Sequence, residues 1–198
     1  MELGARKGRG DILPLPDAPS PMNTAQQLLQ SHRSLALFLA KMLAAYAVWF
    51  ILYDLWLLPD GRLDLWLSTV AATWTADVLH LVGVGAVAEG RTVFTHAAGI
   101  EIVDGCNGLS ALSLFVGFVL AYPGAWARRA LFIPMGLAVI VATNVVRCAS
   151  LLLISGWRPD LFESVHGFHA LFVFYVVIFG LWVAWTHVGE RPAEPALA

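Results

Sequence analysis

The stretch ALFIPMGLAVIVATNVVRCASLLLI, residues 130–154, decides the fold of this chain. It is longer than the roughly 20 apolar residues that cross a bilayer as a helix. Its single charged residue is Arg147. Three further apolar runs lie at residues 35–58, 107–122 and 168–187. The sequence therefore predicts a chain that crosses a membrane several times.

The composition also points to the bilayer as the main solvent. Hydrophobic residues make up 59% of the 198 residues and charged residues 13%, whereas a soluble domain carries about 25% charged residues. The mean hydropathy is +0.72. With a net charge of −2 and no basic block, nothing suggests a nucleic-acid partner. No nucleotide motif is present, so no cofactor is expected.

The expected fold is an all-α polytopic membrane protein with about four to six transmembrane helices. Residues 1–31 contain several prolines and basic residues and cannot bury a core, which predicts a disordered cytoplasmic tail. Residues 32–188 are expected to form one transmembrane domain, and residues 189–198 a short cytoplasmic tail.

Positive charges near the apolar runs set the expected orientation. Arg33 and Lys41 flank the first run, and Arg128 and Arg129 join the second run to the third. Both places are therefore expected on the cytoplasmic side. The opposite ends of the runs, which carry the candidate site residues described below, then face outward.

Residues 59–105 are expected to form an external excursion that begins and ends on the outer side. Within residues 65–87, apolar positions such as Trp66, Trp74 and Val78 recur at helical spacing. This pattern favours a helix lying in the membrane interface. A re-entrant or paired crossing fits the same residues.

A short β-hairpin is expected just before the helix at residues 107–122. Residues 91–95 and 100–103 are rich in β-branched side chains and flank the small residues 97–99. Two such stretches around a tight turn predict paired strands. The hairpin would deliver the chain to Cys106.

Cys106 stands in the segment DGCNGLS, residues 104–110. The flanking glycines permit a sharp turn at the head of the next helix. A helix N-terminus offers unpaired N–H groups and a positive dipole end, which favour the nucleophilic thiolate and can bind an oxyanion. The alternative is that Cys106 is a small buried hydrophobe.

Arg147 is the second candidate, because an arginine inside the bilayer costs about 2.5–3.5 kcal/mol on insertion scales. It must face the other helices and find acceptors there. Asn144 lies three residues earlier on the same helical face. The alternative is a snorkelling anchor.

His166 and His169 open the last run and share a helical face. Imidazole is the natural base beside a thiol. A metal pair is the alternative, but no third ligand has suitable spacing, so no metal is expected. Cys148 follows Arg147 and points about 100° away from it, which favours a packing role.

At these residues the chain resembles the exosortase/archaeosortase family, polytopic membrane transpeptidases that process proteins with a C-terminal sorting signal. Residues 106–109 look like the family's Cys-Ser-Gly-hydrophobic block, with Asn107 in place of the commoner serine. Residues 144–147 are similar to its Asn-x-x-Arg block. His166 followed by Phe174 forms the third block.

The resemblance covers about residues 65–185 and implies roles for individual residues. Cys106 would be the nucleophile, Arg147 the group that stabilises the oxyanion, and His166 the general base and acid. His169 competes for the last role. The chain is short for the family, which suggests a small subtype with a different substrate or a degenerate member.

The resemblance implies a cysteine transpeptidase or protease of the bacterial cytoplasmic membrane, with its active site facing the periplasm. Its partners would be exported proteins with a C-terminal sorting signal and transmembrane anchor, together with membrane lipid. It would cleave before the anchor and transfer the acyl group to an acceptor. The alternative is a non-enzymatic scaffold or assembly factor of an export or polysaccharide system, in which the polar residues form a structural knot.

Overall fold

The computed structural model describes residues 21–164, 167 and 170–189. The chain divides into two compact units, Met1–Leu37 and Phe38–Ala198. The described residues of the first unit belong to helix α1, and all other elements belong to the second. The elements are α1 (Pro21–Leu52), a π-helical turn η1 (Tyr53–Leu57), α2 (Leu58–Asp60), α3 (Arg62–Leu81), β1 (Ala86–Glu89), β2 (Thr92–Thr95), β3 (Gly99–Glu101), α4 (Leu109–Ala121), α5 (Trp126–Trp157), α6 (Pro159–Ser164) and α7 (Ala170–Gly189).

The four apolar runs of the sequence are helical over nearly all of their described residues; in the second run the helix covers Leu109–Ala121. Two helical segments, His32–Asp60 and Trp126–Trp157, are long and apolar enough to cross a membrane. Two shorter apolar segments, Leu109–Ala121 and Phe174–Gly189, lie in α4 and α7. The described part of the chain is therefore mostly helical, as expected, and the number of membrane crossings stays a prediction.

The last residues of the expected N-terminal tail, 21–31, are helical in the structure, because α1 begins at Pro21. Proline suits the first position of a helix, where its missing N–H has no intrahelical partner. The following segment QQLLQ, residues 26–30, consists of good helix formers. Composition indicated disorder here, but local helix propensity continues the first apolar run upstream.

The expected hairpin is present as β2 and β3, and Val93 pairs with Ile100. The sequence did not predict β1, which adds a third antiparallel strand to the hairpin in the order β1-β2-β3. The predicted helix over residues 65–87 therefore ends at Leu81. Gly83 follows with a positive φ of 81°, a conformation that favours glycine and breaks the helix.

Helix α3 has an exposed apolar face and a buried face of small and polar residues. Trp66 and Trp74 are 60% and 49% exposed, so the two tryptophans of the predicted apolar stripe lie on the exposed face, and Trp74 also lines an open groove beside α5. Asp64, Ser68 and Thr75 lie on the buried face. This asymmetry fits the predicted interfacial location, which itself stays a prediction.

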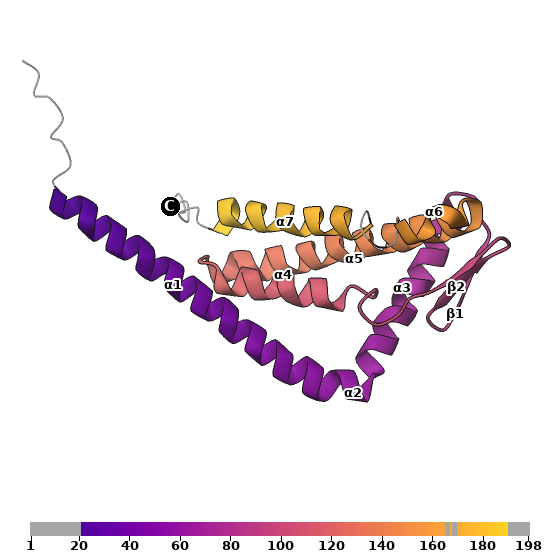
Figure 1. Cartoon of the computed structure of the whole chain (residues 1–198), viewed down its shortest axis with the longest axis horizontal. Coiled ribbons are helices and arrows are strands. Elements are labelled where there is room, and N and C mark those ends of the chain that lie inside the picture. The colour runs from indigo at the N-terminus through magenta and orange to yellow at the C-terminus, as the bar shows by residue number, and fades with distance from the viewer. Residues whose placement is uncertain (1–20, 165–166, 168–169, 190–198) are drawn as a thin grey trace, which may run out of the picture. The chain divides into compact units, whose positions relative to one another are not determined.

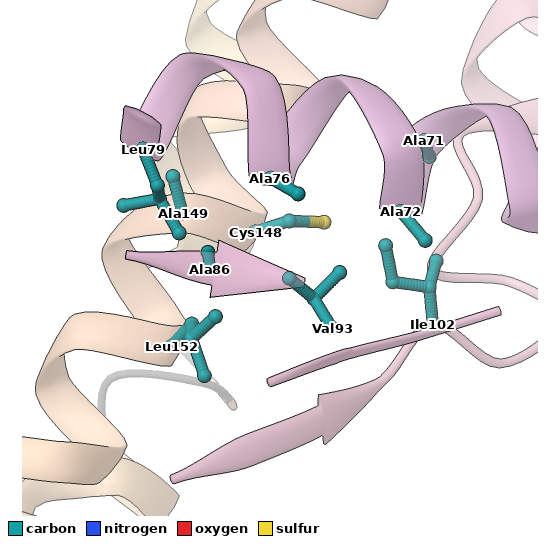
Figure 2. Close-up of a cluster of buried hydrophobic side chains, with 10 residues drawn as sticks. All are labelled: Ala71, Ala72, Ala76, Leu79, Ala86, Val93, Ile102, Cys148, Ala149 and Leu152. Atoms are coloured by element: carbon teal, nitrogen blue, oxygen red, sulfur yellow. The ribbon is translucent and has the colours of Figure 1, made fainter. Parts of the chain in front are cut away.

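One hydrophobic core joins α3, the small sheet and α5 (Figure 2). Figure 2 shows side chains that converge from α3, from β1 and β2, from Ile102 after β3, and from α5. Its buried members are Ala71, Ala72, Ala76, Leu79, Ala86, Val93, Ile102, Cys148, Ala149 and Leu152. Cys106 is partly buried against this core, so the packing of α3 and the sheet on α5 places the candidate nucleophile.

A second core joins α4, α5 and α7, which lie side by side (Figure 1). Its largest fully buried side chains include Phe115 of α4, Ile140 of α5 and Trp185 of α7. At one end of this bundle, Arg128 donates hydrogen bonds to the carbonyl oxygens of Val188 and Gly189. These bonds satisfy carbonyl groups that a helix C-terminus leaves unpaired.

Gly136 allows α4 and α5 to pack closely, because a Cβ at this position would overlap the ring of Phe115. We therefore expect Gly136→Ala to lower the free energy of unfolding by about 1–3 kcal/mol. Gly180→Ala is the matched control, since a Cβ there meets nothing within 4 Å. It should be neutral or stabilising by about 0.5–1 kcal/mol.

Thermal unfolding of both variants in detergent checks this prediction. A lower melting temperature for Gly136→Ala alone supports the close packing of α4 on α5. Equal melting temperatures for the two variants would contradict it.

Candidate active site

Cys106 lies in the turn between β3 and α4, with Gly105 and Gly108 at positive φ values of 84° and 88°. These values favour glycine, as the sequence predicts. The N–H of Cys106 donates to the carbonyl oxygen of Val103 at 2.9 Å. Cys106 precedes α4, which begins at Leu109, so the thiol does not sit in the first turn of the helix.

One amide of the expected helix N-terminus already has an acceptor. The first amide of α4, Leu109 N–H, donates to Asn107 Oδ1 at 3.0 Å. A bond to this side chain satisfies one of the donors expected to bind an oxyanion. Leu109 N–H is therefore a weaker candidate for this role than Arg147.

The structure brings Cys106, Asn144 and Arg147 together. The carbonyl oxygen of Cys106 accepts a hydrogen bond from Asn144 Nδ2 at 3.1 Å and another from Arg147 Nη2 at 2.8 Å. Asn144 and Arg147 share one face of α5, as their spacing predicts. Two donors from α5 thus hold the main chain of Cys106.

Cys106 and Arg147 line one small cavity of about 40 Å³, into which α6 also contributes Phe162. The cavity lies among β3, the Cys106 turn, α5 and α6, and its lining residues are Ile100, Glu101, Ile102, Cys106, Arg147, Cys148, Leu151 and Phe162. Cys148 is buried in the first core, in agreement with the packing role predicted for it. Cys106 and Arg147 therefore line the same small, partly open cavity.

Phe174 of α7 lies under the guanidinium of Arg147, with Arg147 Cζ 5.3 Å from the ring centroid. An arginine over an aromatic face is stabilised by a cation–π interaction. The resemblance drew attention to Phe174, and the structure connects it to Arg147. Arg147 Nε is buried and has no hydrogen-bond partner among the described residues.

Arg147 lies deeper in α5 than a surface anchor would. The helix continues to Trp157, which puts Arg147 about 15 Å from that end at about 1.5 Å per residue. The bonds of Arg147 to the Cys106 carbonyl and its contact with Phe174 direct the side chain into the protein. These contacts disfavour the snorkelling alternative.

Sequence reasoning missed a polar network beside Cys106. Asp64, at the start of α3, is 1% exposed. Its Oδ1 accepts hydrogen bonds from Asn107 Nδ2 at 2.7 Å and from Tyr53 Oη at 3.1 Å. The available signal was the aspartate on the face of α3 opposite the tryptophans, since a charged residue on a buried face needs partners.

His166 and His169 lie outside the described residues, so the assignment of a base stays a prediction. His80 has a structural contact, because its Nε2 accepts a hydrogen bond from Ala86 N–H at 3.3 Å. Over residues 21–164, 167 and 170–189, no group of three His, Cys, Asp or Glu side chains could hold a metal ion.

Residues 28–183 match the transmembrane exosortase family. No curated protein and no solved structure matches the chain at a significant level. The family match covers most of the chain and includes Cys106, Asn144 and Arg147. It agrees with the apolar helices in marking a membrane protein, and it suggests a role of the cysteine transpeptidase kind. The chain therefore belongs to the transmembrane exosortase family.

Proposed function

We propose that this chain is a membrane-embedded cysteine transpeptidase that cleaves exported proteins just before a C-terminal transmembrane anchor and passes the acyl group to an acceptor. The observation that carries the proposal is the shared cavity of Cys106 and Arg147. A nucleophile beside a group that can stabilise an oxyanion is an arrangement that suits acyl transfer.

The first chemical step is the attack of the Cys106 thiolate on a backbone carbonyl carbon of the substrate. A C–S bond forms, and the electron pair of the carbonyl moves to its oxygen. When the tetrahedral intermediate collapses, the C–N bond breaks and the anchor leaves as an amine. The product is a thioester on Cys106.

Arg147 is the group that we assign to the developing oxyanion. Its Nη2 holds the Cys106 carbonyl, which fixes the guanidinium beside the nucleophile. Its buried Nε–H has no partner among the described residues, so a donor remains for the oxyanion. Preorganised donors of this kind supply a large share of catalysis in acyl transfer.

We assign the proton transfers to His166, with His169 as the competing base. The histidine accepts the thiol proton and gives a proton to the leaving amine. It then accepts a proton from the incoming nucleophile, an amine, another acceptor or water, which displaces the thiolate. This assignment rests on the order of the motifs in the sequence.

We place the protein in the bacterial cytoplasmic membrane with the Cys106 turn on the outer face. The basic residues that support this orientation, Arg128 and Arg129, lie in the first turn of the long helix α5, at the end farther from Arg147. Its partners on this proposal are exported proteins with a C-terminal sorting signal, and membrane lipid.

One observation favours a second candidate function. The hydrogen bonds from Asn144 and Arg147 end on the main-chain carbonyl of residue 106, which any amino acid would provide. The same contacts therefore suit a structural polar knot in a non-enzymatic scaffold or assembly factor. On that account the identity of the side chain at 106 would not matter.

A reporter assay tests the proposed function. A panel of secreted domains, each fused to a C-terminal extended segment and transmembrane helix from an exported protein of the same genome, is expressed with the native chain. We expect one or more reporters to lose the anchor by a cut just before the helix, as mass spectrometry would show. If every reporter kept its anchor at normal levels of the protein, the scaffold candidate would be favoured.

A further inference from the structure

A buried carboxylate fixes the residue that follows the candidate nucleophile. Asp64 accepts a hydrogen bond from Asn107 Nδ2 at 2.7 Å, and both side chains are buried, with exposed fractions of 1% and 5%. Tyr53 Oη donates to the same carboxylate oxygen at 3.1 Å. Asp64 therefore connects α3 to η1 and to the Cys106 turn.

The bond to Asp64 sets the orientation of the Asn107 amide. A carboxylate oxygen accepts hydrogen bonds, so the NH₂ group of Asn107 must face it. The amide oxygen then faces the other way and accepts the Leu109 N–H at 3.0 Å. Asn107 thus joins α3 to the first residue of α4.

The main chain of Cys106 is held from two sides as a result. On one side, Asn144 and Arg147 of α5 bind its carbonyl oxygen. On the other side, Asp64 of α3 holds the next residue, Asn107. With two consecutive residues fixed to two different helices, the main chain that carries the thiol has little freedom to move away from the cavity that Cys106 and Arg147 line.

We infer that Asp64 is a positioning residue, which acts through Asn107 to hold Cys106 in place for attack. The inference rests on the proposed function, since it concerns the same nucleophile. Small displacements of a reacting group cost about a hundredfold in rate, so a side chain that never touches substrate can govern the reaction.

The environment of Asp64 supports a role beyond stability. Its second oxygen, Oδ2, and the Oγ of Ser68 one turn later are buried without a hydrogen-bond partner among the described residues. A buried carboxylate with one unsatisfied oxygen is costly, and well-packed apolar residues would often stabilise such a place better. A positioning function accounts for the polar side chain that this buried place retains.

Two substitutions at Asp64 separate hydrogen bonding from charge. Both Asp64→Asn and Asp64→Ala remove the charge, but Asn keeps an oxygen that accepts from Tyr53 and Asn107. Asp77→Ala is the matched control, because Asp77 lies on the same helix and lines a separate groove between α3 and α5. Each variant is made in a Cys148→Ala background, so that Cys106 is the single thiol.

Two rates are measured on the full chain. One is cleavage of an anchored reporter, and the other is alkylation of Cys106 by a small maleimide, which needs no substrate. We expect Asp64→Ala to slow cleavage by about tenfold or more and to speed alkylation by about threefold, because the turn opens more often. Asp64→Asn and Asp77→Ala should change neither rate by more than about twofold.

An exchanged pair tests the contact itself. Asn107→Asp alone places two carboxylates against each other and should slow cleavage by about a hundredfold. The double variant Asp64→Asn with Asn107→Asp restores a donor facing an acceptor and keeps an acceptor for Leu109 N–H. Tyr53 contacts the same oxygen of Asp64, so in the double variant its hydroxyl accepts from the new amide instead of donating. It should recover at least about tenfold of that loss.

The inference is overturned if Asp64→Ala cleaves and labels like Asp64→Asn, or if the exchanged pair recovers nothing. It is also overturned if Asp77→Ala lowers the melting temperature as much as Asp64→Ala does and changes the cleavage and alkylation rates by the same factors. The effects would then come from lost stability alone. If the native chain cut no reporter, the proposed function would fail, and the alkylation rates alone would still decide whether Asp64 positions Cys106.

Discussion

Cells that express the Cys106→Ala variant are expected to leave every anchored reporter uncut. The sulfur of Cys106 forms the C–S bond of the proposed reaction. Its removal should therefore lower the cleavage rate to less than about a thousandth of the native rate. The carbonyl of residue 106 still accepts from Asn144 and Arg147 in this variant, because alanine provides the same main-chain oxygen. The protein level should therefore stay close to normal.

Cys148→Ala is the matched control, since it removes the other cysteine of the chain from the same cavity. Its cleavage rate should stay within about threefold of native, with some loss of stability from the shortened buried side chain. Cleavage by Cys106→Ala at the native rate would contradict the proposed nucleophile and favour the polar knot of a scaffold.

The Arg147→Lys variant is expected to show the second largest effect. Lysine keeps the positive charge but lacks the planar guanidinium. In the native chain one guanidinium nitrogen binds the Cys106 carbonyl, while the Nε–H has no partner among the described residues and can bind the oxyanion. Loss of one preorganised oxyanion donor typically lowers the rate by about 10²–10³-fold. We expect cleavage by Arg147→Lys to fall in that range, as measured with the same reporter at equal protein level.

Arg158→Lys provides the comparison for this substitution. Arg158 follows the end of α5, is exposed, and pairs with Asp160 at 2.8 Å; this hydrogen bond holds the pKa of Asp160 below its ordinary value. Exposed ion pairs contribute little, so Arg158→Lys should cleave normally. If Arg147→Lys also cleaved normally, with the anchor removed at the native rate, Arg147 would have no part in stabilising the oxyanion.

The helices could be predicted because the apolar runs are long and nearly free of charge. The hairpin of β2 and β3 could be predicted as well, since β-branched residues flank a small-residue turn. Strand β1 could not, because its sequence Ala-Val-Ala-Glu carries a weak strand signal directly after a helix. It forms because it pairs with β2 and packs on α3.

The meeting of Cys106 with Asn144 and Arg147 was within reach of the sequence, because a charged residue in an apolar helix must find partners. The Asp64–Asn107 contact was not. These residues are 43 positions apart, and their contact depends on how α3 packs against the Cys106 turn. Pattern reasoning identifies a face of a helix but not the particular side chain that meets it.

The thioester on Cys106 is the central claim, and mass spectrometry of the intact protein tests it most directly. The native chain is mixed with a cleavable reporter and stopped rapidly in acid, before the acceptor reacts. We predict an added mass equal to the secreted domain, located on the peptide that contains Cys106 and released by neutral hydroxylamine, as a thioester would be. Reporter cleavage with no adduct, or with an adduct on another residue, would contradict the account.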